Sequence, residues 1–307
     1  MTASLPLPAW IEAQMPDNTR HQLVDVDGER MHVAEWGPAQ GRTVVLVHGN
    51  PTWSFLWRKV VKAIRARPGG DALRLVAPDL VGLGLSSRPA ADQHTLEHHA
   101  GWLGRALDQV APGPLVLVGQ DWGGSIGLCA LATRRDRLRG IVLGNTAVSP
   151  PRAGFKATLF HRLSQMPVVS TLLFRELGFP LGVLHLSQSD RSSIRGEVAR
   201  AYRWPLAKRA DRAAPLALGR MVPDSLHHPS IGMLQISDEL YRTAKVPISI
   251  VWGTKDPVLG RVIKHLERLR PDAKVVRTDR AGHFLQEEVP ELLADAVLDV
   301  VGRASWT

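Results

Sequence analysis

Three residues that can carry nucleophilic catalysis each follow a short apolar run of the kind that forms a buried strand. Asp121 lies in GQDWGG, Asp256 in WGTKDP and His283 in AGHFLQEE. Glycines on both sides of a nucleophile that follows a strand are typical of a tight strand-to-helix elbow. The carboxyl ends of parallel strands meet at one edge of a sheet. We therefore expect a triad there, with Asp121 as nucleophile, Asp256 as acid and His283 as base.

A carboxylate in the place of the usual serine changes the chemistry. An aspartate with a reference pKa of about 3.9 is already anionic at neutral pH, so it needs no base to become a nucleophile. It attacks a saturated carbon that carries a leaving group and forms an ester on the enzyme. His283, oriented by Asp256, would then activate a water that hydrolyses the ester. The backbone N–H groups of Trp122 and Asn50 are the expected oxyanion donors.

The leaving group decides between two substrate classes, alkyl halides and epoxides. A halide leaves as an anion and needs hydrogen-bond donors, for which the Trp122 indole and the Asn50 amide are candidates. An opened epoxide needs a proton donor, usually tyrosine, and the chain has only Tyr202 and Tyr241. Trp122 as core filling and Asn50 as a turn residue are the plainer interpretations. Their position beside the attack point favours the functional one.

Each triad member also has an ordinary explanation, since an aspartate after a strand often caps a helix and a lone histidine often packs. The order nucleophile, acid, histidine argues against coincidence. Among the twelve histidines, His48 is interpreted as structural. His94, Glu97 and His98 spell a zinc-protease pattern, but His94 should precede the helix that starts near Thr95. The two histidines would then not share a face, so we expect no metal, and no cofactor.

The elements that must position these residues alternate between strands and helices. HQLVDVDGERMHVAEWG predicts a hairpin that turns at Asp27-Gly28. The periodicity of residues 95–110 predicts a helix that buries Leu96, Ala100, Leu103, Leu107 and Val110. Apolar runs that predict strands buried on both faces of a mostly parallel sheet occupy residues 43–49, 74–80, 114–120, 140–146, 246–254 and 273–279, before a terminal helix around 287–301.

The pattern changes after Pro150-Pro151, because residues 152–230 lack strand-like runs and are rich in Leu, Phe, Arg and Pro. Such a segment is too long for a connecting loop and enters at the edge where open sheets bind ligands. It therefore predicts a helical cap over a site, against the alternative of a purely stabilising ornament. The predicted division is a core of residues 1–149 and 231–307 and a cap of residues 150–230.

Composition excludes several classes of protein. The formal net charge is +9, but the basic residues are interspersed with acidic ones and no nucleic-acid-binding motif is present, so no nucleic-acid partner is expected. The single cysteine, Cys129, is expected in the core, in a cytoplasmic protein. The apolar stretch MPVVSTLLF (166–174) makes membrane-surface association conceivable. Lining of a pocket or a subunit contact explains it equally, so no membrane partner is expected.

Several motifs together resemble the haloalkane dehalogenases of the α/β-hydrolase superfamily. They are HGNPTWSFLWR, APDLVGLGLSSRP, GQDWGG, YRWPL, WGTKDP and AGHFLQEE, and they extend over nearly the whole chain after residue 20. HGxP and DWG also occur in epoxide hydrolases, whereas HGNPTW with Asn50 is much more specific. The resemblance implies an α/β-hydrolase fold with a cap, Asp121 as nucleophile, His283 as base and Asn50 with Trp122 as the halide-binding pair.

Family members differ in their acid, and some carry a glutamate after the strand that precedes the cap. Asn145 occupies that place here, so the acid falls to Asp256, as in the family's smaller third subfamily. The resemblance implies a detoxifying hydrolase whose substrates are small apolar haloalkanes and water. Its products would be a primary alcohol, a halide ion and a proton. An epoxide hydrolase is the closest alternative. A fluoroacetate dehalogenase, a luciferase-type monooxygenase and a non-enzymatic ligand-binding protein are less favoured interpretations. The sequence leaves open whether the protein forms a homo-oligomer.

Overall fold

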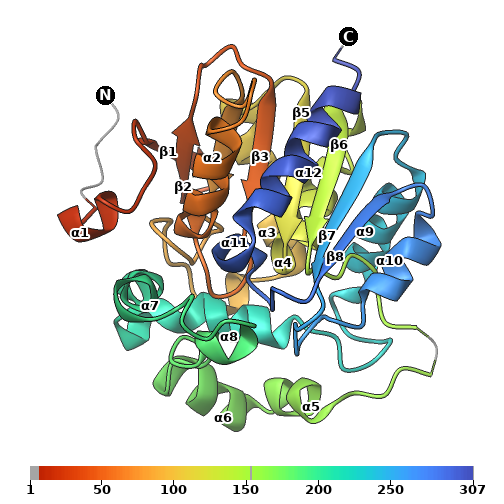
Figure 1. The fold of residues 1–307 in the computed structure, drawn as a ribbon. Helices are drawn as coiled ribbons and strands as arrows, with labels where there is room; N and C mark the ends of the chain where they lie inside the picture. Colours follow the sequence, from red (N-terminus) through yellow and green to blue (C-terminus); the bar gives the residue numbers. More distant parts are fainter. Residues whose placement is uncertain (1–6, 153, 307) are drawn as a thin grey trace.

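A single sheet of eight strands forms the centre of the computed structural model, which describes residues 7–152 and 154–306. The strand order is β1-β2-β4-β3-β5-β6-β7-β8 (Figure 1). β2 pairs antiparallel with β1 and β4, and every other neighbouring pair is parallel, which confirms the mostly parallel sheet. The strands are β1 (Arg20–Val26), β2 (Glu29–Trp36), β3 (Thr43–Val47), β4 (Arg74–Pro78), β5 (Leu115–Gln120), β6 (Leu138–Gly144), β7 (Ile248–Gly253) and β8 (Lys274–Thr278).

The predicted hairpin is confirmed, with β1 and β2 joined at Asp27 and Gly28. Their φ angles are 59° and 78°. A two-residue turn of this kind needs both residues in the left-handed region, and the resulting twist matches that of the two strands. The turn thereby fixes the register in which Val26 pairs with Glu29.

Helices cover both faces of the sheet (Figure 1). α2 and α12 pack together on one face, and α3, α4 and α9 pack on the other. The predicted terminal helix begins later than expected, at α12, since α11 ends before Pro290, the first residue of α12. The core helices are α1 (Ala9–Glu12), α2 (Arg58–Arg65), α3 (Leu96–Val110), α4 (Trp122–Leu131), α9 (Ile231–Thr243), α10 (Ile263–Leu269), α11 (Leu285–Glu288) and α12 (Pro290–Arg303), with short 3-10 turns η1 (Ser54–Trp57), η2 (Ala91–Gln93) and η3 (Arg135–Arg137).

A run of short helices lies between β6 and β7 and confirms the helical insert. In Figure 1 it lies below the sheet, at the edge where β5, β6 and β7 end. The predicted boundaries at residues 150 and 230 stay a prediction. The insert comprises α5 (Leu159–Gln165), α6 (Pro167–Ser170), the π-helical turn η4 (Thr171–Glu176), η5 (Leu184–Ser187), α7 (Gly196–Arg203), η6 (Trp204–Leu206), η7 (Arg209–Arg212) and α8 (Ala213–Arg220).

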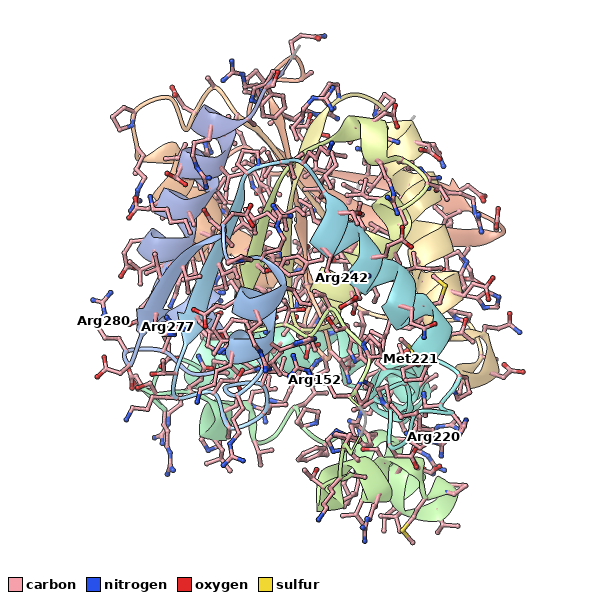
Figure 2. The ribbon with its side chains drawn as sticks, turned by 90° about the vertical axis from the view of Figure 1, so that its right-hand side faces the viewer. Arg152, Arg220, Met221, Arg242, Arg277 and Arg280 are labelled. Atoms are coloured by element: carbon pink, nitrogen blue, oxygen red, sulfur yellow. The ribbon has the colours of Figure 1, made fainter. Side chains whose placement is uncertain are left out.

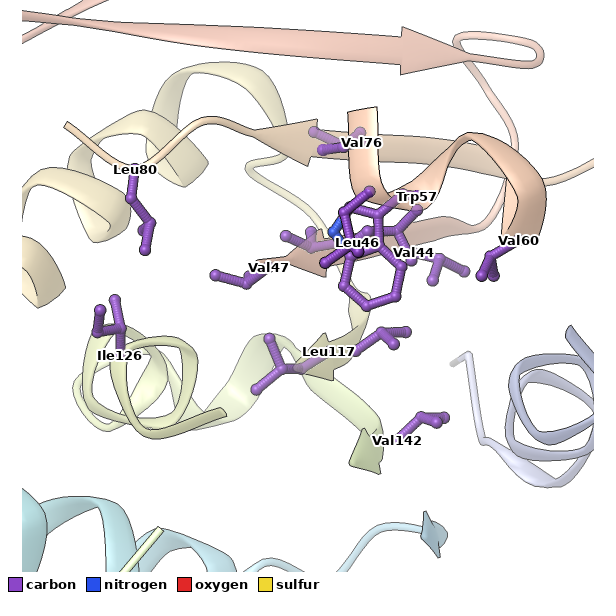
Figure 3. Packing of buried hydrophobic residues seen from close by; sticks show 14 of the residues in the cluster. Val44, Leu46, Val47, Trp57, Val60, Val76, Leu80, Leu117, Ile126 and Val142 are labelled. Carbon is purple, nitrogen blue, oxygen red and sulfur yellow. The ribbon is translucent and has the colours of Figure 1, made fainter. Parts of the chain in front are cut away.

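The core is continuous across the sheet because its central strands are apolar on both faces. Val44, Leu46 and Leu117, on β3 and β5, are fully buried and pack with Trp57 at the end of η1 and Val60 of α2 (Figure 3). Removing a large apolar side chain from water stabilises the fold by roughly 1.5–3 kcal/mol. This packing holds rigid the strand ends from which the candidate site is built.

The expected face of α3 is confirmed, since all five predicted residues, Leu96, Ala100, Leu103, Leu107 and Val110, are buried. Cys129 is also buried, as expected, and its thiol lies 3.1 Å from the Met233 carbonyl oxygen. Burial raises the pKa of that thiol to about 12, so it is not a nucleophile at neutral pH. None of the helices in the described part of the chain combines the length and the apolar composition that crossing a bilayer requires.

A buried ion pair fastens the insert to the core. Arg58 of α2 donates two hydrogen bonds to the Glu287 carboxylate, at 2.5 and 2.9 Å, and Tyr202 of α7 donates a third. Burial by itself would raise the pKa of Glu287, but the charge of Arg58 outweighs it and the pKa falls below its ordinary value. Trp53 adds a second attachment by donating its indole N–H to the Ala201 carbonyl of α7, at 3.2 Å.

Candidate active site

Asp121 lies on a strained turn between β5 and α4. Its φ of 51° and ψ of −131° lie in a region that residues with a side chain rarely adopt, at a cost of roughly 1–3 kcal/mol. Two bonds from the strand-end loop after β6 hold the turn. The Asp121 N–H donates to the Asn145 carbonyl at 3.0 Å, and the Thr146 hydroxyl donates to the Asp121 carbonyl at 2.5 Å. The elbow predicted from GQDWGG is therefore present.

Two glycines make room for this turn. A Cβ atom on Gly49 would lie 2.1 Å from Oδ1 of Asp121, and one on Gly123 would lie 2.0 Å from the Val47 carbonyl oxygen. Neither separation is tolerable for real atoms, so any larger residue would displace the nucleophile or the start of α4. The glycines of HGNP and DWGG are therefore required by close approach of the chain to itself.

The three predicted triad residues are brought together at the sheet edge. The Nδ1 atom of His283 lies 2.9 Å from Oδ2 of Asp256, and its Nε2 atom lies 3.6 Å from Oδ2 of Asp121. The other Asp256 oxygen accepts N–H bonds from Val258 and Leu259, at 2.7 and 3.1 Å. Asp256 thus orients the imidazole, whose far nitrogen faces the Asp121 carboxylate.

The electrostatics of the site are set by two carboxylates around one imidazole. Burial by itself would lower the pKa of His283, but Asp256 and Asp121 overcome it and raise the pKa to about 10. Burial would raise the pKa of Asp256, and the facing His283 more than offsets this, so that pKa is lowered. The ring nitrogens of His283 thus face two carboxyl groups, that of Asp256 at Nδ1 and that of Asp121 at Nε2.

Asn145 joins the acid to the rest of the site. Its side-chain N–H donates to Oδ2 of Asp256 at 2.7 Å and also lies 3.1 Å from the Gly253 carbonyl oxygen. Its side-chain oxygen accepts the Gly253 N–H at 2.8 Å. The sequence identifies Asn145 only as the residue at the place of the family's glutamate. It is fully buried and fixes the carboxylate that orients His283.

Two glutamines support the histidine, and sequence reasoning missed both. Gln120, directly before the nucleophile, donates to the His283 carbonyl at 3.1 Å, and the same nitrogen lies 3.4 Å from His283 Nε2. Gln188, from the insert, accepts the Phe284 N–H at 2.9 Å, while the His283 N–H donates to the Ser187 carbonyl at 2.8 Å. The adjacency of Gln120 to Asp121 was a usable signal. Gln188 had none, because it is distant in sequence.

Asn50 contacts the nucleophile through its backbone, and its side-chain amide has a partner that the sequence did not indicate. The Asn50 backbone N–H donates to Oδ1 of Asp121 at 2.8 Å, which suits an oxyanion donor. Its side-chain nitrogen donates to the Pro215 carbonyl of α8 at 3.2 Å, so one of its two N–H bonds is engaged by the insert. Trp122 is the first residue of α4, where a backbone N–H has no acceptor within the helix.

The hydroxyl groups of both tyrosines donate hydrogen bonds to acceptors outside the triad. The Tyr202 hydroxyl donates to the buried Glu287 carboxylate, and the Tyr241 hydroxyl donates to the Leu266 carbonyl at 3.2 Å. Both residues are fully buried. The proton donors that an epoxide hydrolase would draw from these two residues are therefore absent from the site.

The two histidines of the zinc-protease pattern, His94 and His98, do not lie on one face of a helix. His94 lies before α3, as expected, and its Nδ1 atom is 3.1 Å from Nε2 of His99. In the described ranges, no cluster of three His, Cys, Asp or Glu side chains has the geometry of a metal site.

Open space reaches the nucleophile, since 17% of the Asp121 side chain is exposed, whereas His283 retains only 6%. A separate hollow of about 320 Å³ lies on the insert, lined by residues such as Leu184, Arg195 and Arg203. None of the predicted site residues lines it, so this hollow is not the chamber of the triad.

Comparison with known proteins defines first the broad class. Residues 42–290 match the model of the alpha/beta hydrolase fold family. The structure of the tetrameric haloalkane dehalogenase DpaA from Paraglaciecola agarilytica superimposes with a TM-score of 0.81 at 23% identity, covering 96% of this chain and 97% of that one. The chain is thus an α/β-hydrolase by sequence and by fold.

Two relatives narrow the class. Haloalkane dehalogenase 2 of Mycobacterium tuberculosis (strain ATCC 25618 / H37Rv) is 32% identical over 286 residues, covering 89% of this chain and 92% of the relative. The cis-3-alkyl-4-alkyloxetan-2-one decarboxylase of Xanthomonas campestris pv. campestris is 29% identical, covering 88% and 91%. The chain belongs to the haloalkane dehalogenase family of α/β-hydrolases.

Proposed function

We propose that this protein is a haloalkane dehalogenase that converts a haloalkane and water into an alcohol, a halide ion and a proton. The observation that carries the proposal is the Asp121 carboxylate on its elbow, with Nε2 of His283 at 3.6 Å and Asp256 behind the ring. A carboxylate nucleophile suits displacement at saturated carbon, and the histidine suits hydrolysis of the ester that results.

The first step is displacement. Oδ1 of Asp121 is held by the Asn50 N–H, so the Oδ2 atom is the one that attacks the carbon. The new C–O bond forms as the carbon–halogen bond breaks, and the electron pair of that bond leaves with the halide. The Trp122 indole N–H and the free N–H of the Asn50 amide receive the anion. Donors placed where charge develops in a dry site contribute several kcal/mol to such a step.

The second step is hydrolysis. Alkylation removes the charge of Asp121, so the imidazole of His283 faces one carboxylate instead of two and releases its proton more readily. Neutral His283 then takes a proton from water, and the hydroxide attacks the ester carbonyl carbon of Asp121. The charge that develops on Oδ1 is stabilised by the backbone N–H groups of Asn50 and Trp122. As the intermediate collapses, the bond between the carbonyl carbon and the alkoxy oxygen breaks, and the leaving alkoxide takes the proton from His283 to form the alcohol. The carboxylic acid left on Asp121 then passes its proton to His283, so the one proton released to solvent in each cycle is the one that His283 loses after alkylation.

The proposed core of residues 1–149 and 231–307 supplies all five of these residues, and the proposed cap of residues 150–230 closes over them. The cap supplies the Pro215 carbonyl against Asn50 and the Ser187 carbonyl against the His283 backbone. The substrate range is therefore set where the cap meets the core. The dehalogenase of P. agarilytica is described as tetrameric, and sedimentation velocity measures whether this chain also self-associates.

The test is product analysis with three substrate classes. 1-Bromobutane and 1,2-dibromoethane should release bromide and alcohol, and styrene oxide should release no diol, with the Asp121→Ala variant as the inactive control. A cis-3,4-dialkyl oxetan-2-one, the substrate class named for the X. campestris relative, is assayed for carbon dioxide. Diol or carbon dioxide without halide release would overturn the proposal.

A further inference from the structure

The exposed apolar side chains of this protein are concentrated in one part of the insert. Among the described residues, nine large apolar side chains are exposed, and six of them lie within residues 166–186. Val168 is 82% exposed and Leu177 is 70% exposed. We call this segment, with α6 and η4 at its centre, the outer cap face. Its six exposed members are Met166, Val168, Leu172, Leu177, Val183 and Leu186.

The insert as a whole, rather than residues 166–186 with their one arginine and one glutamate, holds most of the net charge. Residues 150–230 contain twelve Lys and Arg against five Asp and Glu, a net charge of +7, whereas the whole chain carries +9. The remaining residues therefore carry only +2. Nine of the twelve basic side chains are exposed. The excess of positive charge is thus a local property of the insert.

Cationic side chains border the apolar ones. α5, which carries exposed Arg162, packs against α6, and η7, which begins with exposed Arg209, packs against η4. Arg209 pairs with Glu176 at 2.8 Å, and exposed Lys208 precedes it. Both views place α5 and α6 farthest from the sheet (Figures 1 and 2), with Arg220 labelled on the neighbouring α8 in Figure 2.

We propose that the outer cap face docks on an anionic lipid bilayer, with its apolar side chains in the interface and the bordering arginines and lysines against the headgroups. Apolar side chains bordered by basic residues are the composition that binds anionic membrane surfaces. A second copy is a poorer occupant. Apposed cap faces would bring two segments of +7 together, and the rest of the chain, with a net charge of +2, has no net negative charge to offset them.

This proposal differs from the sequence-based expectation of no membrane partner, which no observation yet tests. Residues 166–174 were equally explained there as lining a pocket or forming a subunit contact. The structure exposes Met166, Val168 and Leu172 to solvent, so they do not line an internal pocket.

The location has a consequence for catalysis, which rests on the proposed function. α6 and η4 pack on α8, and Pro215 of α8 accepts the Asn50 side-chain N–H. Only α8 would then lie between a docked bilayer and the side-chain amide of Asn50, the proposed halide donor. Haloalkanes are apolar and concentrate in bilayers, so docking would place the enzyme where its substrate is most abundant.

The experiment is vesicle co-sedimentation, which needs no enzymatic activity and therefore fails or succeeds independently of the proposed function. The protein should sediment with vesicles of equal phosphatidylglycerol and phosphatidylcholine, bind vesicles of phosphatidylcholine alone weakly, and be released by salt. Leu172→Asp, and Val168→Asp one turn away, should each lower the partition coefficient about tenfold. The matched control is Ile236→Asp on α9, which is 39% exposed and outside the insert. It should bind as the unmodified protein does.

A second pair of variants tests the charge. Arg162→Gln and Lys208→Gln should weaken binding to the anionic vesicles and leave the thermal unfolding midpoint unchanged. Equal binding to neutral and anionic vesicles would overturn the proposal. So would the absence of vesicle binding combined with an oligomer that Leu172→Asp converts to monomers in sedimentation velocity, because the face would then cover another copy of the chain.

Discussion

Replacing the nucleophile with its neutral isostere should lower the pKa of His283. In Asp121→Asn, the imidazole keeps Asp256 at 2.9 Å and loses the anion at 3.6 Å from its Nε2 atom. The same charge disappears in the catalytic cycle when Asp121 is alkylated. The variant therefore isolates the electrostatic step that frees the base for hydrolysis.

The magnitude follows from Coulomb's law. Two unit charges 3.6 Å apart interact with about 1 kcal/mol in water and about 5 kcal/mol at an effective dielectric constant of 20. This range corresponds to about 1 to 3 pKa units. Because Asp121 is only partly exposed, the local dielectric lies between these limits. We expect the His283 pKa to fall from about 10 to about 7–9.

The assay is NMR titration of the histidine ring nitrogens in the unmodified protein and in Asp121→Asn, with His283→Phe used to assign the signal. Mass spectrometry of the variant checks that the amide is intact. An unchanged His283 pKa in Asp121→Asn would refute the electrostatic coupling of nucleophile and base. The coupling also predicts that, where hydrolysis limits turnover, kcat rises with pH through an apparent pKa below 10.

Three further substitutions separate the supporting interactions. Glu287→Gln leaves buried Arg58 without its counter-ion and should lower the free energy of unfolding in urea by about 3–5 kcal/mol. Glu291→Gln breaks the exposed pair with Arg280 and should lower it by less than about 1 kcal/mol. Equal losses would contradict the role of burial. Asn145→Ala removes a hydrogen bond to the Asp256 carboxylate and should slow ester hydrolysis about 10- to 100-fold in single-turnover kinetics, without slowing the halide burst. Trp122→Phe should slow that burst by about tenfold or more; an unchanged burst would mean that the indole N–H does not hold the halide.

The parts of the site that the sequence predicts are those encoded locally. The glycines of GQDWGG predict the elbow because only glycine permits the approach of the chain at Gly123. The three triad residues follow strand ends, and parallel strands gather such ends at one edge. The hairpin at Asp27-Gly28 is similarly encoded by two adjacent residues with positive φ.

The parts that the sequence does not predict depend on contacts between distant segments. Gln188 reaches the histidine loop from the insert, and the Asn50 amide meets the Pro215 carbonyl only after the insert has packed. Apolar periodicity also cannot tell a buried helix face from an exposed one when the segments beside it are unknown. For this reason the sequence leaves pocket lining, a subunit contact and membrane-surface association open for residues 166–174, and only the structure shows that Val168 is exposed.

The central claim is that Asp121 forms a bond to carbon, and trapping that bond tests it most directly. His283→Phe removes the base but leaves the nucleophile and its donors in place. After incubation with 1-bromobutane, peptide mass spectrometry should find one butyl group on the peptide that contains Asp121, with about one bromide released per site. An unmodified peptide, or sustained turnover by this variant, would contradict the account.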